Sequence, residues 1–419
     1  MSPQKRKKFD RCIVVKFGGS SLANKSKIDS AAKAVAKEVS NGTRIVVVVS
    51  AIGKTTDFLL DTTKQACRGK ISDEELDDIL SMGERTSARI FSATLKANGV
   101  KCFYLDPIDP GWPIITDKSF NNAKPILSVC EKLIKKHVLS SIGRNIVVVI
   151  PGFIGKTEDG KITTLGRGGS DTTALIVARA LSADQMILVT NVDGIMSADP
   201  KIIRKPQLLK EIHVNTLIGL TDSGTKFIHK KALKYKDPSI EVKVINNASG
   251  DLESDGTIVH GSLPNYMPVE MSTQATTAVT IVGNAISESL QILQEVLQKI
   301  NDAKVPILGI SIDYNSLILY LPGNGIDELL ETLHSIVVAY DQTSALAVKQ
   351  NLAFIRVRGV GLEETPGIIS RLAESLYSAR INIFGIFTIT SSVLVFVDFN
   401  DREKAIKLIQ KSIKVSVND

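Results

Sequence analysis

The first half of this 419-residue chain alternates short runs of β-branched residues with segments of helical periodicity. This alternation is typical of a parallel sheet covered by helices on both faces. Several of the expected strands are apolar throughout, as strands buried on both faces are. Strands are expected at 12–17, 44–50, 101–105, 145–151, 186–190 and 242–245, and helices at 27–40, 73–98, 124–139 and 171–181. The pattern predicts an α/β fold, an αβα sandwich with a mainly parallel central sheet.

A second region begins where Asn, Gly, Ser, Asp and Pro cluster, at residues 246–268. Beyond it, the order strand, helix, strand, strand, helix occurs at 277–338 and again at 351–411. Two units of about 70 residues with this order indicate a tandem of ferredoxin-like (βαββαβ) domains. We therefore expect a catalytic domain at 1–262 and two small domains at 263–345 and 346–419.

The positive charge is concentrated in the first region. Residues 1–262 hold 39 Lys and Arg against 28 Asp and Glu, whereas residues 263–419 hold 12 against 16. The first region is therefore suited to anions. Nucleic acid is one candidate, but aromatic residues make up only 5% of the chain and no nucleic-acid-binding motif is present. Small phosphorylated ligands fit better, and no nucleic-acid partner is expected.

Membrane, secretion and metal signals are also missing from the sequence. The longest apolar runs, such as 45–49 and 146–150, fall far short of the ~18 residues of a membrane span. No apolar stretch and cleavage site follow the basic residues 5–8, so a cytoplasmic location is expected. The four cysteines form no CxxC pair and lack histidines at zinc spacing, and we interpret them as reduced core residues.

Three segments are glycine-containing or polar: two follow expected strands, and one runs from a turn into an expected helix. VVKFGGSS at 14–21 combines a lysine with glycines that let backbone N–H groups approach phosphate, although GG after a strand is also an ordinary tight turn. TTLGRGGSD at 163–171 leads into a helix and presents Arg167, whose planar fork matches a carboxylate; Ser170 or Asp171 also serves as an ordinary helix cap. TNVDGIMSADPK at 190–201 follows a buried strand. Ligands of open α/β sheets bind at the carboxyl ends of strands, so the three segments are expected to face one crevice.

Two further glycine patterns do not match nucleotide-binding motifs. GKT at 53–55 lacks the first glycine of a Walker A loop, and GRG at 166–168 lacks the third glycine of a dinucleotide fingerprint. The sequence therefore favours neither a P-loop NTPase nor a Rossmann dehydrogenase.

Taken together, these segments resemble aspartate kinase, of the amino acid kinase superfamily. The family motif KFGGTS corresponds to 16–21, VSAMGxTTDxLL to 49–60 and SxGExxSA to 81–88, and TTLGRGGSDTTA is unchanged at 163–174. The C-terminal tandem resembles the paired ACT domains of that family, with ETPGII at 364–369 and RINI at 380–383.

The resemblance implies ATP-dependent phosphorylation of the β-carboxylate of L-aspartate to 4-phospho-L-aspartate, the first step of lysine, threonine and methionine biosynthesis. Its implied cofactors are ATP and Mg²⁺, with the metal held by phosphates and water and no protein metal ligand assigned. The acceptor carboxylate is already ionised, so catalysis consists mainly of positioning and charge stabilisation.

The resemblance also implies a role for individual residues. Lys16, Asp171 and Lys226 would be catalytic, with Asp171 orienting both lysines. The aspartate site would comprise Thr56, Glu84, Arg167, Gly168, Gly169 and Ser170, with Arg167 on the α-carboxylate and Glu84 on the α-amino group. ATP would contact Lys16, Gly18, Gly19, Ser20, Ser50, Thr190, Asn191, Met196, Lys201, Lys226 and Phe227.

The sequence departs from the family in the nucleotide segment. Asn191, Met196 and Lys201 replace the usual Asp, Tyr and Arg, and His229-Lys230 replaces His-Pro. Because Asn keeps hydrogen bonding, Met keeps an apolar face and Lys keeps the charge, we expect weakened nucleotide contacts.

Regulation follows from the ACT resemblance. Lysine or threonine is expected as feedback inhibitor, and the effector site would include Gly367, Ile368, Asn382, Ile383, Thr390 and Ser391. The ACT domains are expected to join a homodimer or tetramer, and a role in dimerisation alone is the alternative. Two other functions stay open: a kinase of the same fold acting on glutamate or UMP, and a catalytically weak amino-acid sensor.

Overall fold

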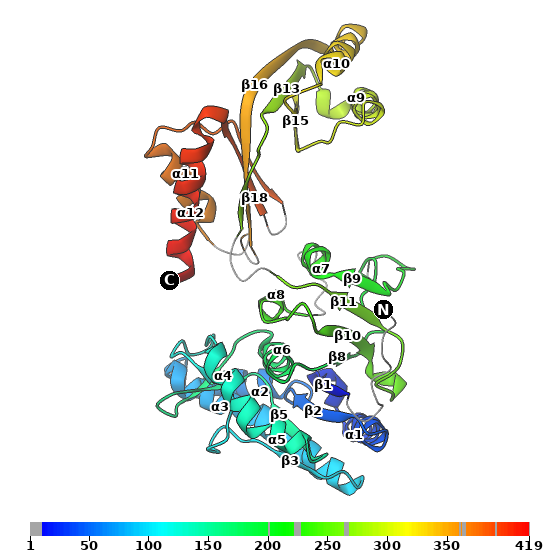
Figure 1. The fold of residues 1–419 in the computed structure, drawn as a ribbon, viewed down its shortest axis with the longest axis vertical. Coiled ribbons are helices and arrows are strands. Elements are labelled where there is room, and N and C mark those ends of the chain that lie inside the picture. Colours follow the sequence, from blue (N-terminus) through cyan, green and yellow to red (C-terminus); the bar gives the residue numbers. More distant parts are fainter. Residues whose placement is uncertain are drawn as a thin grey trace, which may run out of the picture. The chain divides into compact units, whose positions relative to one another are not determined.

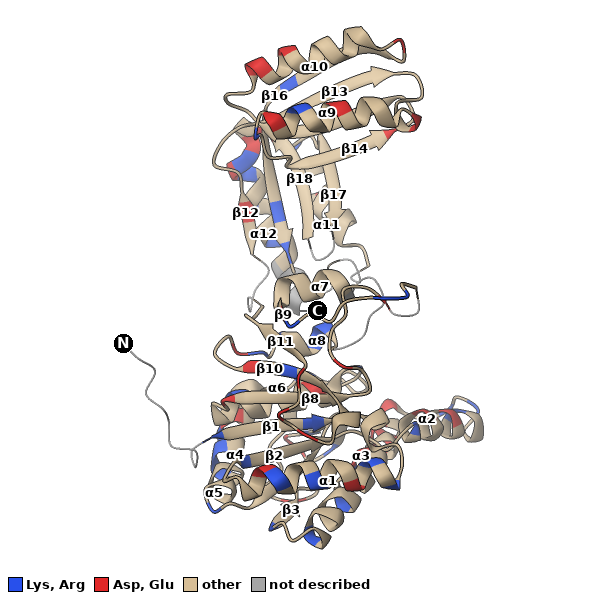
Figure 2. Cartoon of the chain, turned by 90° about the vertical axis from the view of Figure 1, so that its right-hand side faces the viewer, with Lys and Arg blue, Asp and Glu red and all other residues tan. Residues whose placement is uncertain are grey.

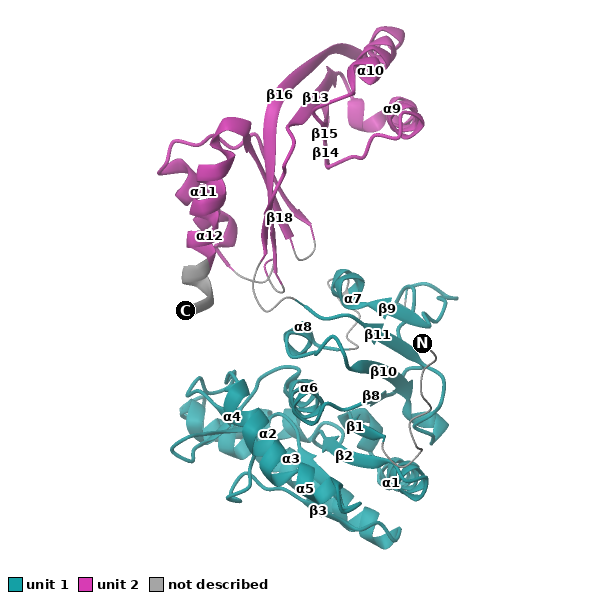
Figure 3. Ribbon diagram, in the orientation of Figure 1, with its two compact units in different colours: residues 1–263 teal, residues 264–419 magenta. Residues whose placement is uncertain are grey.

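The computed structural model describes residues 11–199, 202–221, 228–263, 268–359, 362, 366–389 and 392–418. The chain divides into two compact units, residues 1–263 and 264–419 (Figure 3). The two units share no sheet, and each is built around hydrophobic core residues of its own.

An eight-stranded sheet forms the centre of the first unit, in the order β3-β5-β2-β1-β8-β10-β11-β9. Neighbouring strands are parallel from β3 to β10 and between β11 and β9, and only β10 and β11 are antiparallel. The predicted mainly parallel sheet is confirmed. Its strands are β1 (Cys12–Phe17), β2 (Arg44–Val49), β3 (Cys102–Tyr104), β5 (Val147–Pro151), β8 (Gln185–Thr190), β9 (Glu211–His213), β10 (Glu241–Asn246) and β11 (Thr257–His260).

Helices cover both faces of this sheet (Figure 1). Alternate residues Ile13, Val15 and Phe17 of β1 share a core with α1 and α3, whereas Lys16 points to the opposite face, where α6 packs on β1 and β2. This arrangement is the predicted αβα sandwich. The helices are α1 (Lys25–Ser40), α2 (Thr55–Ala66), α3 (Asp73–Ala97), α4 (Leu127–His137), α5 (Leu139–Ile142), α6 (Gly169–Leu181), α7 (Val214–Thr221) and α8 (Lys230–Leu233).

Several elements of the first unit have no counterpart among those expected from the sequence. A three-stranded sheet consists of β4 (Ile115–Thr116), β6 (Ile154–Thr157) and β7 (Ile162–Thr164), and a short 3₁₀ helix covers Gly19–Leu22. Strands of two to four residues are too short to show an alternating pattern. Helix α2 exposes most of its residues, so its apolar stripe is narrow and gives only a weak helical periodicity in the sequence.

Charged side chains of the first unit lie mostly outside its sheet. Figure 2 shows Lys, Arg, Asp and Glu along α1 and α2, whereas β2 is nearly free of them. Five of the six residues of β2 are buried. Most of the excess lysines of this unit therefore belong to solvated helix surfaces rather than to a ligand site.

The second unit contains one seven-stranded sheet, in the order β14-β15-β13-β16-β18-β17 with β12 also beside β16. Its strands are β12 (Val269–Met271), β13 (Thr276–Gly283), β14 (Gly309–Asp313), β15 (Ser316–Pro322), β16 (Thr343–Arg358), β17 (Gly385–Ile389) and β18 (Ser392–Asp398). Its helices are α9 (Leu290–Asp302), α10 (Asp327–Ala339), α11 (Ile368–Tyr377) and α12 (Arg402–Asn418). One core joins β13 and β15 to α9 and α10, and another joins β16 and β18 to α11 and α12.

Strand β16 runs through both halves of this sheet. Residues 343–352 pair with β13, and residues 352–358 pair with β18, with β12 on the other side of residues 355–357. The strand expected to begin the second repeat, from residue 351, covers only the second half. Most of residues 344–351 are exposed, so the first half lacks the burial pattern of a core strand. The boundary expected between residues 345 and 346 falls inside this continuous strand.

The four cysteines are free thiols. Cys12 and Cys130 are buried, and burial raises the pKa of each thiol to about 11. Within the described part of the chain, no helix is long and apolar enough to cross a membrane.

Candidate active site

The carboxyl ends of the central strands bring the three sequence segments to one edge of the sheet. In register, Phe17 of β1 lies beside Val49 of β2 and Val189 of β8, and Val189 lies beside Ile245 of β10. The loops that follow these strands therefore begin next to one another. This edge is where open α/β sheets bind their ligands.

An ion pair between Lys16 and Asp171 lies at this edge. The Lys16 Nζ is 2.7 Å from the Asp171 Oδ1, and the two side chains are only 15% and 11% exposed. Asp171 stands in the first turn of α6, where the helix dipole stabilises its negative charge. The strand and the helix thus hold a lysine ammonium in a fixed, largely dehydrated position.

Gly19 lies where two loops cross. A Cβ on Gly19 would come within 2.8 Å of the Ala51 carbonyl oxygen and 2.9 Å of the Gly53 carbonyl oxygen. The Gly53 N–H donates to the Gly19 carbonyl at 3.0 Å, and the Gly18 N–H donates to the Val189 carbonyl at 3.3 Å. Packing between loops therefore explains Gly19, and the Gly18 amide is already used within the protein.

Glu84 of α3 is buried beside the same loops, with only 4% of the residue exposed. Its Oε1 accepts a hydrogen bond from the Ala51 N–H at 3.1 Å, while its Oε2 has no hydrogen-bond partner among the described residues. Burial raises the pKa of Glu84 to about 7, against the opposing effects of the Ala51 amide and the Lys16 charge. The buried Oε2 is therefore available to a ligand donor.

The Arg167 loop connects β7 to α6. Gly166 and Gly168 on either side of Arg167 have φ values of +69° and +75°, which favour glycine. A Cβ on Gly168 would also collide with His229. Arg167 itself is exposed and forms no ion pair with another described residue, while Ser170 is buried. The loop thus presents a guanidinium whose hydrogen-bonding groups are open to a ligand.

The segment after β8 is polar and partly ordered by side-chain contacts. The Thr190 Oγ1 donates to the Asn191 Oδ1 at 3.3 Å, and the Asn246 Nδ2 donates to the Asp193 Oδ1 at 2.7 Å. Met196 and Leu208 form an isolated antiparallel β-bridge through their backbones. Of the sequence-predicted residues, Lys201, Lys226, Phe227, Thr390 and Ser391 lie outside the described residues.

The remaining predicted residues of the first unit lie on the segments that follow β1 and β2. Ser50 donates its backbone N–H to the Phe17 carbonyl at 3.1 Å, Ser20 is exposed, and the Thr56 Oγ1 lies 3.7 Å from the position of a Cβ on Gly83. In the second unit, Gly367 has φ +77° and precedes α11, Ile368 is buried and Asn382 is exposed.

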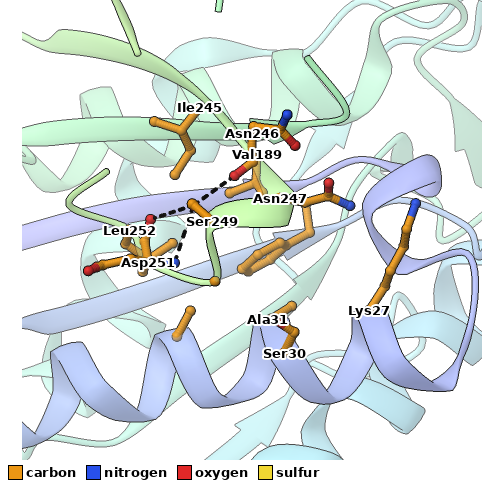
Figure 4. A pocket seen from close by; sticks show the side chains of 13 residues that line it. Lys27, Ser30, Ala31, Val189, Ile245, Asn246, Asn247, Ser249, Asp251 and Leu252 are labelled. Atoms are coloured by element: carbon orange, nitrogen blue, oxygen red, sulfur yellow. Dashed lines mark hydrogen bonds between the residues drawn. The ribbon is translucent and has the colours of Figure 1, made fainter. Parts of the chain in front are cut away.

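A small pocket lies between α1 and the loop after β10 (Figure 4). Its lining includes Lys27, Ser30, Asn246 and Asp251, and its space of about 10 Å³ admits about one water molecule. It is too small for a nucleotide or an amino acid.

Sequence reasoning missed Asp77 of α3, two helical turns before Glu84. Asp77 is fully buried, and its Oδ2 accepts the Asn121 N–H and the Thr164 N–H, both at 2.8 Å. The Thr164 Oγ1 donates to its Oδ1 at 2.6 Å. A signal was present: the spacing of seven puts Asp77 and Glu84 on one face of the helix, among apolar residues.

Comparisons with known proteins identify the family of this chain. A family model described as "Amino acid kinase family" matches residues 11–246, and one described as "ACT domain" matches residues 347–411. The aspartokinase of Geobacillus stearothermophilus is 30% identical over 388 residues, which cover 88% of this chain and 89% of that protein. The aspartokinase of Mycobacterium tuberculosis (strain ATCC 25618 / H37Rv) is 30% identical over 419 residues, covering 94% of each chain.

Solved structures share the fold. The aspartate kinase from Synechocystis has a TM-score of 0.78 and 26% identity, covering 96% of this chain and 69% of that one. E. coli aspartokinase III in complex with aspartate and ADP has a TM-score of 0.55 and 23% identity, covering 96% and 99%. The resemblance inferred from the motifs is confirmed. The chain belongs to the amino acid kinase family and, within it, to the aspartokinases.

Proposed function

We propose that this chain transfers the γ-phosphoryl group of ATP to the β-carboxylate of L-aspartate, giving 4-phospho-L-aspartate and ADP. The observation that carries the proposal is the Lys16–Asp171 ion pair at the sheet edge where buried Glu84 and exposed Arg167 are also held. The aspartokinase relatives and the solved complex of E. coli aspartokinase III with aspartate and ADP support it.

Glu84 and Arg167 suit a zwitterionic amino acid. The unpartnered Oε2 of Glu84 can accept from the α-ammonium group, and the Arg167 fork can clamp the α-carboxylate through two parallel hydrogen bonds. Thr56 and Ser170 supply further hydroxyls, and Gly168 supplies a backbone N–H group. The Gly169 N–H donates to the Gly166 carbonyl at 2.9 Å, so Gly169 contributes close backbone approach at the start of α6. A nucleoside monophosphate such as UMP has no α-ammonium group to pair with Glu84.

The acceptor oxygen needs no general base, because the β-carboxylate is ionised at neutral pH. An oxygen of that carboxylate bonds to the γ-phosphorus as the bond to the β,γ-bridging oxygen breaks and ADP leaves. Lys16 stabilises the charge on the transferring phosphoryl group, and Asp171 fixes the position of its ammonium. Lys226 is proposed on its motif alone as the second lysine.

ATP is proposed to lie over Gly18, Gly19, Ser20, Thr190 and Asn191. Within the described residues, no group of three or more His, Cys, Asp or Glu could hold a metal ion. We propose that Mg²⁺ would be held by phosphate oxygens and water and would neutralise phosphate charge when bound.

The second unit is proposed to regulate the enzyme. We propose lysine or threonine as its effector, bound near Gly367, Ile368, Asn382 and Ile383. The ACT domain match supports a regulatory role, and the solved E. coli aspartokinase III in complex with lysine and aspartate supports lysine. We also propose a homodimer or tetramer formed through this unit, a cytoplasmic location, and a domain boundary at 262.

The test is ADP release with L-aspartate, L-glutamate and UMP in turn, with hydroxylamine added to trap an acyl phosphate as its hydroxamate. Aspartate-dependent ADP and hydroxamate in equal amounts are expected. Release with glutamate or UMP instead contradicts the proposed substrate. No turnover, with a melting temperature raised by lysine or threonine, favours the sensor function.

A further inference from the structure

We propose that Lys231 is a positioning residue for aspartate binding: its side chain holds the loop that presents Arg167. The inference rests on the proposed function, because it takes Arg167 as the clamp for the substrate α-carboxylate. Lys231 belongs to none of the motifs that suggested the site.

The Lys231 side chain extends from α8 to the Arg167 loop. Its Nζ donates to the Leu165 carbonyl at 2.6 Å and also contacts the Asn122 Oδ1. Leu165 is fully buried, and its own N–H donates to the Phe153 carbonyl at 2.8 Å. The lysine therefore bonds to the last firmly buried residue before Arg167.

The loop needs such an anchor because two flexible residues flank Arg167. Gly166 and Gly168 both have left-handed φ values, and glycine in the unfolded chain has the greatest backbone freedom to lose. A Cβ on Gly166 would lie 2.9 Å from the Asn121 carbonyl oxygen, so that glycine packs directly on the segment that Lys231 also contacts.

Helix α8 is placed to act as this anchor. It packs against α6, which begins at Gly169 (Figure 1). His229 caps α8 by accepting the Lys231 N–H at its Nδ1, at 3.4 Å, and also packs on Gly168. The Arg167 loop is thus enclosed by residues 121–122 on one side and residues 229–231 on the other.

The electrostatic setting is unusual for a lysine. Lys231 forms no ion pair with a carboxylate among the described residues, and its ammonium is satisfied by neutral oxygens. Burial lowers the pKa of Lys231, and the charge of Lys234 lowers it further. Removing the ammonium would leave the Leu165 carbonyl and the Asn122 amide oxygen without this donor, so the loop would lose two restraints.

The experiment compares Lys231→Met with Lys231→Arg in the full-length chain, with Lys234→Met as the control for an exposed lysine of the same segment. For Lys231→Met, we expect the aspartate KM to rise about 10- to 100-fold, with the ATP KM within about 2-fold of wild type. Lys231→Arg keeps the charge and several hydrogen-bond donors, so its aspartate KM should stay within about 5-fold of the wild-type value. Lys234→Met should leave both KM values unchanged.

Two measurements keep the test decisive. Aspartate affinity from calorimetry without ATP should weaken in parallel with KM, and Lys231→Gln, which keeps one neutral donor, should be intermediate if Lys231→Met does not fold. A lowered melting temperature with unchanged aspartate KM and affinity would make Lys231 merely structural and overturn the inference. If the wild type itself releases no ADP with aspartate, the proposed function and this inference both fail; an active wild type with an unaffected variant refutes the inference alone.

Discussion

Glu84→Gln should make the protein more stable and less active, with a stability gain that depends on pH. Glu84 is buried, and burial raises the pKa of its carboxyl from 4.5 to about 7. Gln resembles the protonated acid: its Oε1 can still accept the Ala51 N–H, and its Nε2 takes the place of the unpartnered Oε2. The substitution thus removes an ionisation and little else from the unliganded protein.

The magnitude follows from linkage. The unfolded carboxyl ionises near pH 4.5 and the folded one only near pH 7, so the unfolded state gains a relative advantage as pH rises between these values. Above pH 7 the full difference applies, at about 1.4 kcal/mol per unit of pKa, or about 3 kcal/mol. Glu84→Gln should therefore match wild type near pH 4.5 and exceed its free energy of unfolding by up to about 3 kcal/mol at pH 8.5.

The assay is urea unfolding at pH 5.0 and 8.5, followed by fluorescence of Trp112, the chain's single tryptophan, which is buried in the first unit. Asp78→Asn, on an exposed position of the same helix, is the control and should change neither value. A stability difference that is the same at both pH values would refute the reasoning. For activity, the aspartate KM of wild type should fall as pH rises through about 7, and Glu84→Gln should lose this dependence and raise KM about 100-fold.

Three further substitutions test other parts of the site. Lys16→Met should lower kcat by about 10³-fold with little change in secondary structure measured by circular dichroism; near-normal turnover would remove Lys16 from its role. Gly19→Ala should cost about 1–3 kcal/mol in urea unfolding because its Cβ meets two carbonyl oxygens, and a stability equal to wild type would contradict the close packing of the loops. Arg167→Lys keeps the charge but loses the planar fork, so the aspartate KM should rise about 10-fold or more at constant ATP KM; an unchanged KM would exclude a bidentate clamp.

The sequence predicted the elements whose residues are buried along their whole length. Strand β2, which after Arg44 consists of one isoleucine and four valines, was expected within one residue of its observed bounds, because an uninterrupted apolar run is typical of a strand buried on both faces. The first half of β16 was not predicted, because most of its side chains are exposed. Its strand conformation comes from backbone pairing with β13, which requires no particular side-chain polarity.

The site residues differ in the same way in how far a sequence pattern reveals them. Glycines and charged residues that are contiguous in one motif, such as those around Arg167, could be located because the residues that act together are neighbours in the sequence. The backbone partners of Asp77 and Lys231 could not be located, because Asp77 is 87 residues from Thr164 and Lys231 is 66 from Leu165. A single Asp or Lys has no spacing pattern that reveals such a distant backbone partner.

The continuous β16 has a consequence for how the second unit unfolds. Its 16 residues contribute Leu346 to the packing with α9 and α10 and Ile355 to the core with α11 and α12, so neither core can lose this strand without loosening the other. Strand β16 changes its pairing from β13 to β18 near Asn351. The φ of +58° at Asn351 marks an irregularity in the strand at this position. The two ferredoxin-like halves should consequently melt in one calorimetric transition, and a cavity made in either core should lower the transition temperature of both.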